Sequence, residues 1–168
     1  MFARHSFVLT ALIVAAPGAY AETIKLSAYP GEFNVKTLGS GVSNGEITAS
    51  VRILKFNSSK AWPPAAYAGL YQGADRSSSI QFLIIRNRNT DPNLVAGYGV
   101  VEGGCESQVE SVENLPLDAT AHVTLTFKDG MVMLKLNDGN VHRIRTPFTK
   151  VAPYVSVSPS IAEFLIAP

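Results

Sequence analysis

The chain has 168 residues, with 14 Lys and Arg against 13 Asp and Glu, so its formal net charge is +1. Nucleic-acid-binding proteins normally carry a clear basic excess, and this balance therefore predicts no nucleic-acid partner. Cys105 is the only cysteine, which excludes an internal disulfide and fits a small, partly buried residue better than a reactive thiol.

The first 21 residues have the pattern of an export signal. Arg4 and His5 provide a short positive region, an apolar run follows at residues 7–16, and Ala19-Tyr20-Ala21 has the small-x-small pattern that signal peptidase recognises. We therefore predict cleavage of a signal peptide (1–21) after Ala21 and a secreted or periplasmic mature protein. The apolar run is too short to span a membrane and no later stretch is long enough, so no transmembrane segment is expected in the mature chain.

Short apolar runs separated by turn residues predict strands throughout the N-terminal half. The expected strands cover residues 23–27, 33–38, 46–56 and 65–71. At 46–56 apolar and polar residues alternate, and the apolar face consists of Ile47, Ala49, Val51 and Ile53. This alternation predicts a strand with one buried face and one face toward water.

The middle of the chain predicts a hairpin followed by an irregular segment. Residues 79–88 and 93–102 are apolar on both faces, which indicates central strands. Gly97 and Gly99 leave a strip of bare backbone on one face, for close packing or for a ligand. Residues 103–118 are predicted to be a short helix or an irregular strand, because glutamates recur there at helical spacing while glycines and Pro116 bracket the segment.

Residues 120–145 predict a three-stranded antiparallel meander, because two Asp-Gly dipeptides separate three alternating runs. With Asp129 and Gly130 as the first loop, one face receives the apolar pairs Phe127 with Val132, Leu125 with Leu134, and Val123 with Leu136. The second turn is less regular: pairing Leu134 with Ile144 requires a bulge near Asn140, and we predict one there.

Two last strands, at 153–158 and 161–166, complete a count of about ten to twelve strands with no long helix. The prediction for residues 22–168 is therefore a single all-β domain of the sandwich kind.

Three stretches carry a resemblance to a known superfamily. Residues 44–53 look like the strand that enters a sandwich after a glycine turn, residues 68–71 with 79–85 look like the next pair, and 122–141 look like its hairpin with an Asp-Gly turn. In these places the chain resembles the concanavalin A-like lectin and glucanase superfamily, particularly its laminin G-like modules. The resemblance implies a two-sheet antiparallel jelly-roll sandwich whose concave sheet and rim loops bind glycan, peptide or lipid. Some members are glycosidases or lyases, but the glucanase signature Glu-x-Asp-x-Glu is absent here, so the resemblance supplies no catalytic residue.

The formal motifs do not support a catalytic or metal centre. Residues 41–45 match the Gly-x-Ser-x-Gly pattern, but a nucleophile elbow needs a strand before it and a helix after it, so we interpret the motif as a turn. His122 and His142, the only histidines after the leader, lack ligands at metal-motif spacing. No metal or other cofactor is therefore predicted.

Aromatic faces stack on sugar rings and arginine forks bind hydroxyls or carboxylates, which makes these two residue types the candidates for a glycan surface. The candidate ligand-binding residues are Trp62, Tyr67, Tyr71, Arg76, Arg86 and Arg88. The alternative is that the tyrosines belong to the core and that the arginines pair with Glu102 and Glu106.

The sequence thus favours an exported, non-catalytic binding module, with carbohydrate as the expected ligand. One alternative is a polysaccharide-acting glycosidase or lyase with a diverged acid pair. Another is a structural protein whose partner is a cell-envelope component.

Overall fold

The computed structural model describes residues 21–57, 62–72 and 77–167, which form twelve strands. The predicted signal peptide, apart from Ala21, lies outside the described residues. Among the described residues there is no helix with the length and apolar character needed to cross a membrane.

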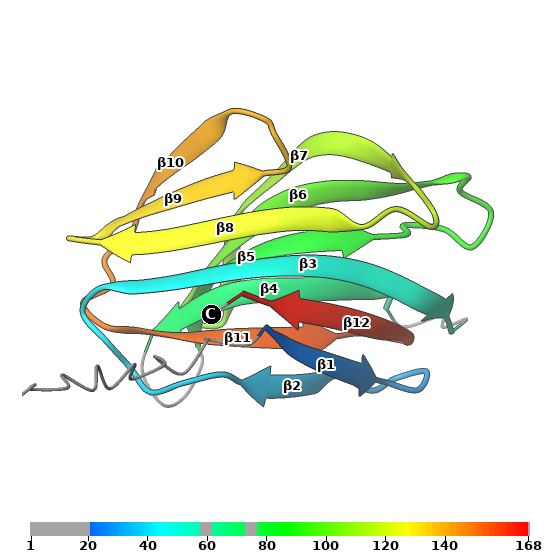
Figure 1. Cartoon of the computed structure of the whole chain (residues 1–168), viewed down its shortest axis with the longest axis horizontal. Coiled ribbons are helices and arrows are strands. Elements are labelled where there is room, and N and C mark those ends of the chain that lie inside the picture. Colours follow the sequence, from blue (N-terminus) through cyan, green and yellow to red (C-terminus); the bar gives the residue numbers. More distant parts are fainter. Residues whose placement is uncertain (1–20, 58–61, 73–76, 168) are drawn as a thin grey trace, which may run out of the picture.

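Two six-stranded sheets stack face to face (Figure 1). Sheet A has the order β1 (Glu22–Ser27), β12 (Ser160–Ile166), β3 (Gly45–Phe56), β8 (Ala121–Lys128), β9 (Met131–Leu136) and β10 (Val141–Arg145). Sheet B has the order β2 (Asn34–Thr37), β11 (Val151–Val157), β4 (Ala65–Gln72), β5 (Ser78–Ile85), β6 (Asn93–Glu102) and β7 (Cys105–Pro116). Every neighbouring pair is antiparallel, and the prediction of an all-β, two-sheet antiparallel jelly-roll sandwich is confirmed.

The core lies between the sheets and receives the inward face of each strand. The largest side chains in it are at most 1% exposed; they are Phe82 from sheet B and Phe127 and Phe164 from sheet A. The predicted alternation of β3 is present, since its Ile47, Ala49, Val51 and Ile53 are buried. Burial of one face of each sheet is the main term that stabilises a sandwich of this kind.

The first hairpin of the meander has the predicted register. Phe127 lies opposite Val132, and the pairing continues as expected along β8 and β9. Asp129 and Gly130 both have positive φ angles, 51° and 72°, as a two-residue hairpin turn requires. Upstream, the Gly-x-Ser-x-Gly segment is a loop that leads into β3, so its interpretation as a turn is confirmed.

The predicted bulge near Asn140 is wrong. In the structure β9 and β10 pair without a bulge, with Leu134 opposite His142 and Val132 opposite Ile144. Asn137, rather than the Asp-Gly pair, takes the positive φ angle, and its backbone N–H donates to the His122 carbonyl oxygen at 2.7 Å. Because the chain turns at Asn137, β10 pairs with β9 in a different register from the predicted one. The His142 ring then lies on the same face as Leu134 and packs against Tyr98, with ring centroids 5.4 Å apart.

The irregular segment is a strand, and the helical alternative for it is wrong. β7 pairs along its whole length with β6, with register shifts between Ala96 and Gly97 and between Val100 and Val101. Each shift adds an extra residue to β7, which explains why its glutamates do not alternate as in a regular strand.

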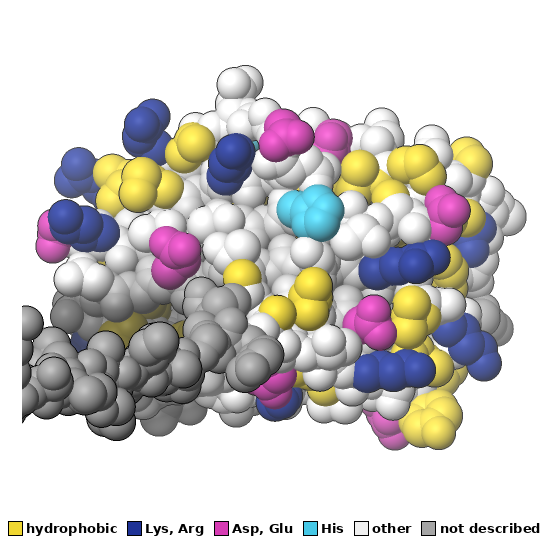
Figure 2. Space-filling view, viewed as in Figure 1, with side chains coloured by type: hydrophobic (Ala, Val, Ile, Leu, Met, Phe, Trp, Pro, Cys, Tyr) yellow, Lys and Arg dark blue, Asp and Glu magenta, His cyan; other side chains and the backbone are white. Residues whose placement is uncertain are grey.

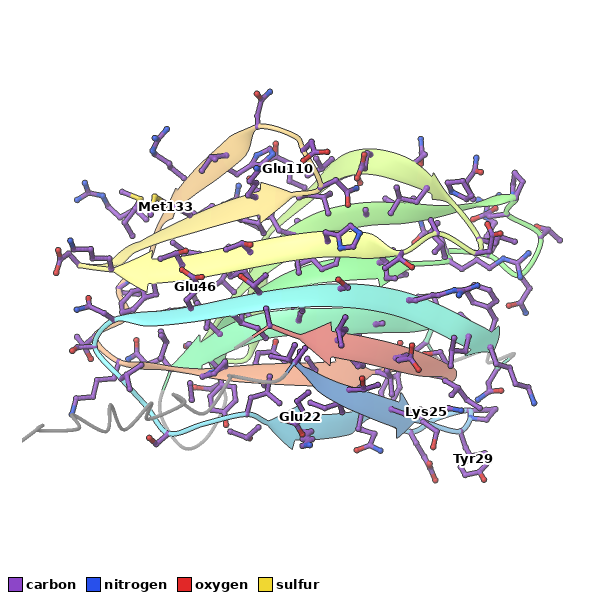
Figure 3. All side chains as sticks on the ribbon, in the orientation of Figure 1. Glu22, Lys25, Tyr29, Glu46, Glu110 and Met133 are labelled. Carbon is purple, nitrogen blue, oxygen red and sulfur yellow. The ribbon has the colours of Figure 1, made fainter. Side chains whose placement is uncertain are left out.

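Polar contacts close both long edges of the sandwich. At one edge the Lys36 ammonium lies 2.7 Å from the Glu22 carboxylate, which joins β2 to β1. At the other edge the Asn137 amide donates to Glu113, and the Tyr98 hydroxyl donates to Glu110, which is labelled in Figure 3. The first bond joins the turn between β9 and β10 of sheet A to β7 of sheet B, and the second joins β6 to β7 within sheet B.

The Tyr98 contact predicts a loss of stability in alkali. Burial, together with the hydrogen bond to Glu110 and its negative charge, raises the pKa of Tyr98 to about 12. An unfolded chain releases this proton near pH 10, so the stabilisation is complete below about pH 10 and is lost as the pH rises to about 12. We expect a loss of up to roughly 3 kcal/mol in the free energy of unfolding, measured by urea titration across this range.

The control is Tyr98→Phe, which removes the ionisable hydroxyl and keeps the ring. This variant should lose less stability than the native protein between pH 10 and 12. The same alkaline loss in both proteins would contradict the role assigned to Tyr98.

Candidate functional site

The face of sheet B that points away from sheet A carries a groove made of two adjoining hollows. The first, of about 200 Å³, is here called the aromatic hollow; its lining includes Phe33, Val35, Tyr71, Ser79, Gln81 and Tyr154. The second, of about 270 Å³, is called the polar hollow; its lining includes Tyr67, Gln81, Asn87, Gly97, Glu106 and Ser111. Gln81 lines both hollows, so together they form one groove across the central strands β4, β5 and β6.

Hydrogen bonds fix the floor of the aromatic hollow. Tyr71 and Tyr154 come from the paired strands β4 and β11, and their ring centroids are 5.3 Å apart. The Tyr71 hydroxyl lies 2.6 Å from Thr37 Oγ1, and the Tyr154 hydroxyl donates to Gln81 Oε1 at 2.7 Å. Because the rings and the Gln81 amide are held in this way, the hollow exists before any ligand arrives.

Gly69 makes room for this arrangement. It lies opposite Tyr154 in the sheet, and a Cβ atom at position 69 would be only 2.8 Å from the Tyr154 ring. Tyr154 therefore lies flat over bare backbone, as a glycine within a strand permits.

In the polar hollow, an aromatic ring lies close to a carboxylate. The rings of Tyr67 and Phe33 have centroids 5.7 Å apart. Burial raises the pKa of Tyr67, a hydrogen bond with Ser158 lowers it by less, and the negative charge of Glu106 adds to the increase. Tyr67 thus presents a neutral hydroxyl at ordinary pH, within the electrostatic reach of Glu106.

The two glycines of β6 have different roles. A Cβ atom on Gly97 would overlap the carbonyl oxygen of Glu110, so this glycine serves close packing against the bulged strand β7. A Cβ atom on Gly99 would meet nothing nearer than 3.7 Å, and it would lie 3.8 Å from Nε2 of Gln81. Gly99 is therefore buried backbone beside the Gln81 side chain, with room for a Cβ atom.

The structure places two of the predicted site residues in the groove. Tyr67 and Tyr71 both point to the outer face of sheet B, where Tyr71 packs with Ala152 and Tyr154 in a cluster separate from the inter-sheet core. The core alternative, which the sequence left open, thus holds for Tyr71 only in the sense that it is buried in this second cluster, while Tyr67 is half-buried.

The predicted arginines are not brought into the groove together. The Arg86 guanidinium lies 5.2 Å from the ring centroid of Phe56 in sheet A, and its Nε donates to the Asp91 carbonyl oxygen. The Arg88 backbone N–H donates to the Asp91 carboxylate, and Arg76 lies outside the described residues. Where the chain is described, neither Arg86 nor Arg88 forms an ion pair, so the alternative of their pairing with Glu102 and Glu106 is not present either.

Trp62 is not among the described residues that line either hollow. Its side chain is 47% exposed, and the neighbouring Pro63 carbonyl accepts a hydrogen bond from Ser158, which also contacts Tyr67. This contact anchors the loop of Trp62 at the edge of the polar hollow.

Sequence reasoning missed Phe33, Gln81, Glu106 and Tyr154 as groove residues. Strands were predicted for Phe33, Gln81 and Tyr154, and a short helix or an irregular strand for the segment of Glu106. The outward face of each depends on neighbours far away in the sequence. Gly99 was the available signal, since its bare backbone lies beside Gln81.

The outer face of sheet A also has a hollow, of about 280 Å³, whose lining includes Glu46 of β3 and Thr126 and Lys128 of β8. Along the central strands this face is polar. Its polar side chains bond to one another: Thr48 Oγ1 lies 3.1 Å from Thr124 Oγ1, and Ser50 Oγ lies 2.8 Å from Nδ1 of His122. Figure 2 shows this face with basic and acidic side chains interspersed. In the described part of the chain, no group of three or more His, Cys, Asp or Glu side chains is placed to hold a metal ion.

A scan against protein-family models and a search of curated proteins found no match to this sequence. Solved structures do match. The carbohydrate binding module CBM66 from Bacillus subtilis has a TM-score of 0.57 at 11% identity, over 81% of this chain and 82% of that one. CG-16, a homodimeric agglutinin from chicken liver, has a TM-score of 0.52 at 13% identity, over 79% and 99%.

The PL7 alginate lyase AlyA1 from the marine organism Zobellia galactanivorans has a TM-score of 0.51 at 12% identity, over 94% of this chain and 82% of that one. The three matched proteins thus include binding proteins and an enzyme, and at these identities the likeness concerns the fold alone. The chain therefore has a jelly-roll sandwich consistent with the concanavalin A-like fold, and its ligand must be argued from the groove itself.

Proposed function

We propose that the protein is an exported, non-catalytic carbohydrate-binding module of the concanavalin A-like superfamily, and that the groove on sheet B holds an oligosaccharide. The observation that carries this proposal is the lining of the groove. Aromatic side chains stand beside a fixed amide and small hydroxyls along an open channel.

This lining suits the two kinds of surface that a sugar presents. The C–H face of a pyranose ring packs on an aromatic side chain, while its hydroxyls require hydrogen-bond donors and acceptors nearby. Phe33 is 48% exposed and so has ring surface available, and Gln81 offers an amide that Tyr154 holds in place. The printed descriptions of CBM66 and CG-16, a carbohydrate binding module and an agglutinin, are in line with this proposal.

The carboxylates support binding rather than hydrolysis. Glycoside hydrolysis needs two carboxyl groups on either side of the scissile bond. Glu110 and Glu106 both line the polar hollow, but the Glu110 carboxylate accepts a hydrogen bond from the hydroxyl of Tyr98, which belongs to the inter-sheet core. Glu106 is then the one glutamate of the described lining that is left to face a ligand.

Phe33→Ala is expected to weaken binding of any glycan that the groove holds. The change removes the exposed aromatic wall of the groove, and we expect roughly a three- to tenfold rise in Kd because one aromatic contact is lost. The measurement is a glycan-array screen of the native protein, followed by calorimetric titration of the best ligand into both proteins.

Tyr29→Ala is the matched control. Tyr29 is 71% exposed on the β1–β2 turn and is not part of the groove lining (Figure 3). Binding that falls with Phe33→Ala and persists with Tyr29→Ala supports the proposal. No binding to any glycan by the native protein would refute the function, and equal effects of the two variants would refute the site.

A further inference from the structure

The groove has an uneven distribution of charge. Glu106 is exposed and lines the polar hollow, and its charge acts on the Tyr67 hydroxyl. Among the described residues, no Lys or Arg lines either hollow. Arg86, which directly follows β5, is held by Phe56 and by the Asp91 carbonyl oxygen. The described lining thus presents a carboxylate with no basic partner.

Such a lining discriminates between ligands by charge. A carboxylate without a basic partner attracts a cation and repels an anion, and this difference decides specificity more than it decides total affinity. The aromatic rings add to the preference, because their faces also attract cations. Uronic acids and sulfated sugars are disfavoured for the same reason.

We propose that the groove selects oligosaccharides whose sugars carry protonated amino groups, and that Glu106 is the residue that determines this specificity. This inference rests on the proposed carbohydrate-binding function and names the class of sugar that the same groove prefers.

The layout of the groove allows one ligand to use both hollows. Tyr71 and Tyr67 are four residues apart on β4, which is about 13 Å along a strand. This spacing exceeds the length of one sugar unit, so a chain of several sugars is needed to reach both hollows. A sugar over the floor of Tyr71 and Tyr154 packs its apolar face, and a sugar further along the chain brings its amine to Glu106.

The experiment compares a chitosan oligosaccharide with its N-acetylated counterpart of the same length, by calorimetric titration into the native protein, Glu106→Gln and Glu163→Gln. Glu163 is an exposed glutamate on β12 of sheet A, so the second variant makes the same change of charge on the opposite face. An alginate oligosaccharide serves as the anionic probe.

We expect the native protein to bind the chitosan oligosaccharide more tightly than the acetylated one, and to bind the alginate oligosaccharide most weakly. Glu106→Gln should weaken chitosan binding roughly three- to fivefold, as befits one exposed ion pair, and leave binding of the acetylated probe unchanged. High salt should produce the same selective loss, because salt screens an exposed pair. Glu163→Gln should behave as the native protein.

Two results would overturn the inference and leave the proposed function intact. One is equal affinity of the native protein for the chitosan and the acetylated oligosaccharides. The other is an equal loss of chitosan binding in both variants, which would indicate general attraction of a polycation. Failure to bind these probes, together with failure to bind any array glycan, would refute the proposed function as well.

Discussion

Gly97→Ala is expected to destabilise the protein by roughly 1–3 kcal/mol, as overpacking of a buried site does. The added Cβ atom would overlap the Glu110 carbonyl oxygen, which belongs to the backbone and cannot move aside as a flexible side chain would. The bulge that places this carbonyl over Gly97 is itself held by pairing along the whole of β7. The loss should appear as a lower midpoint in urea unfolding followed by circular dichroism.

Gly99→Ala, two residues further along β6, is the matched control. A Cβ atom there would meet nothing nearer than 3.7 Å, so the alanine should fit. It should raise stability by about 0.5–1 kcal/mol, because glycine loses more conformational freedom on folding. Equal effects of the two substitutions would contradict the close approach of β7 to Gly97.

Gly99→Val is expected to weaken glycan binding by roughly tenfold or more, about 1.4 kcal/mol, while the protein stays folded. On the same outer face, Gly97 lines the polar hollow and Val101 the aromatic one, so Gly99 stands on the floor between them. A valine side chain there would rise beside Gln81 and block a ligand that spans both hollows. Valine also suits a strand, so stability should not fall.

The control for this variant is Gly41→Val. A Cβ atom on Gly41 would have only ordinary contact with Lys150, at 3.9 Å, and Gly41 lies in a loop that does not line the groove. Calorimetry with the best array glycan should show weaker binding for Gly99→Val alone. Full affinity in the Gly99→Val variant would place the ligand somewhere else.

The local sequence predicted the pairing of two strands correctly where the turn between them is also determined by local sequence. The Asp129-Gly130 turn of the first hairpin has the angles that its dipeptide favours, and the apolar pairs follow from it. The second hairpin could not be predicted in this way, because Asn137 is held by His122 of β8 and by Glu113 of β7. These contacts come from other strands, and an apolar pattern within the hairpin does not reveal them.

The candidate site was predicted only in part for a similar reason. Tyr67 and Tyr71 share a face because strand alternation alone requires it. The position of Arg86 depends on Phe56, thirty residues earlier in the chain and in the other sheet. The different roles of Gly97 and Gly99 depend on a bulge in β7. The sequence did not predict this bulge, because the spacing of the glutamates in that segment also fitted a helix.

The most direct test of a ligand site on sheet B is an NMR titration of the isotope-labelled protein with the best array glycan. The largest amide shifts are expected at Gln81, Gly97 and Gly99, with smaller changes at Tyr67. Shifts confined instead to Ser50, His122 and Thr124, on the outer face of sheet A, would contradict the assignment of the groove as the binding site.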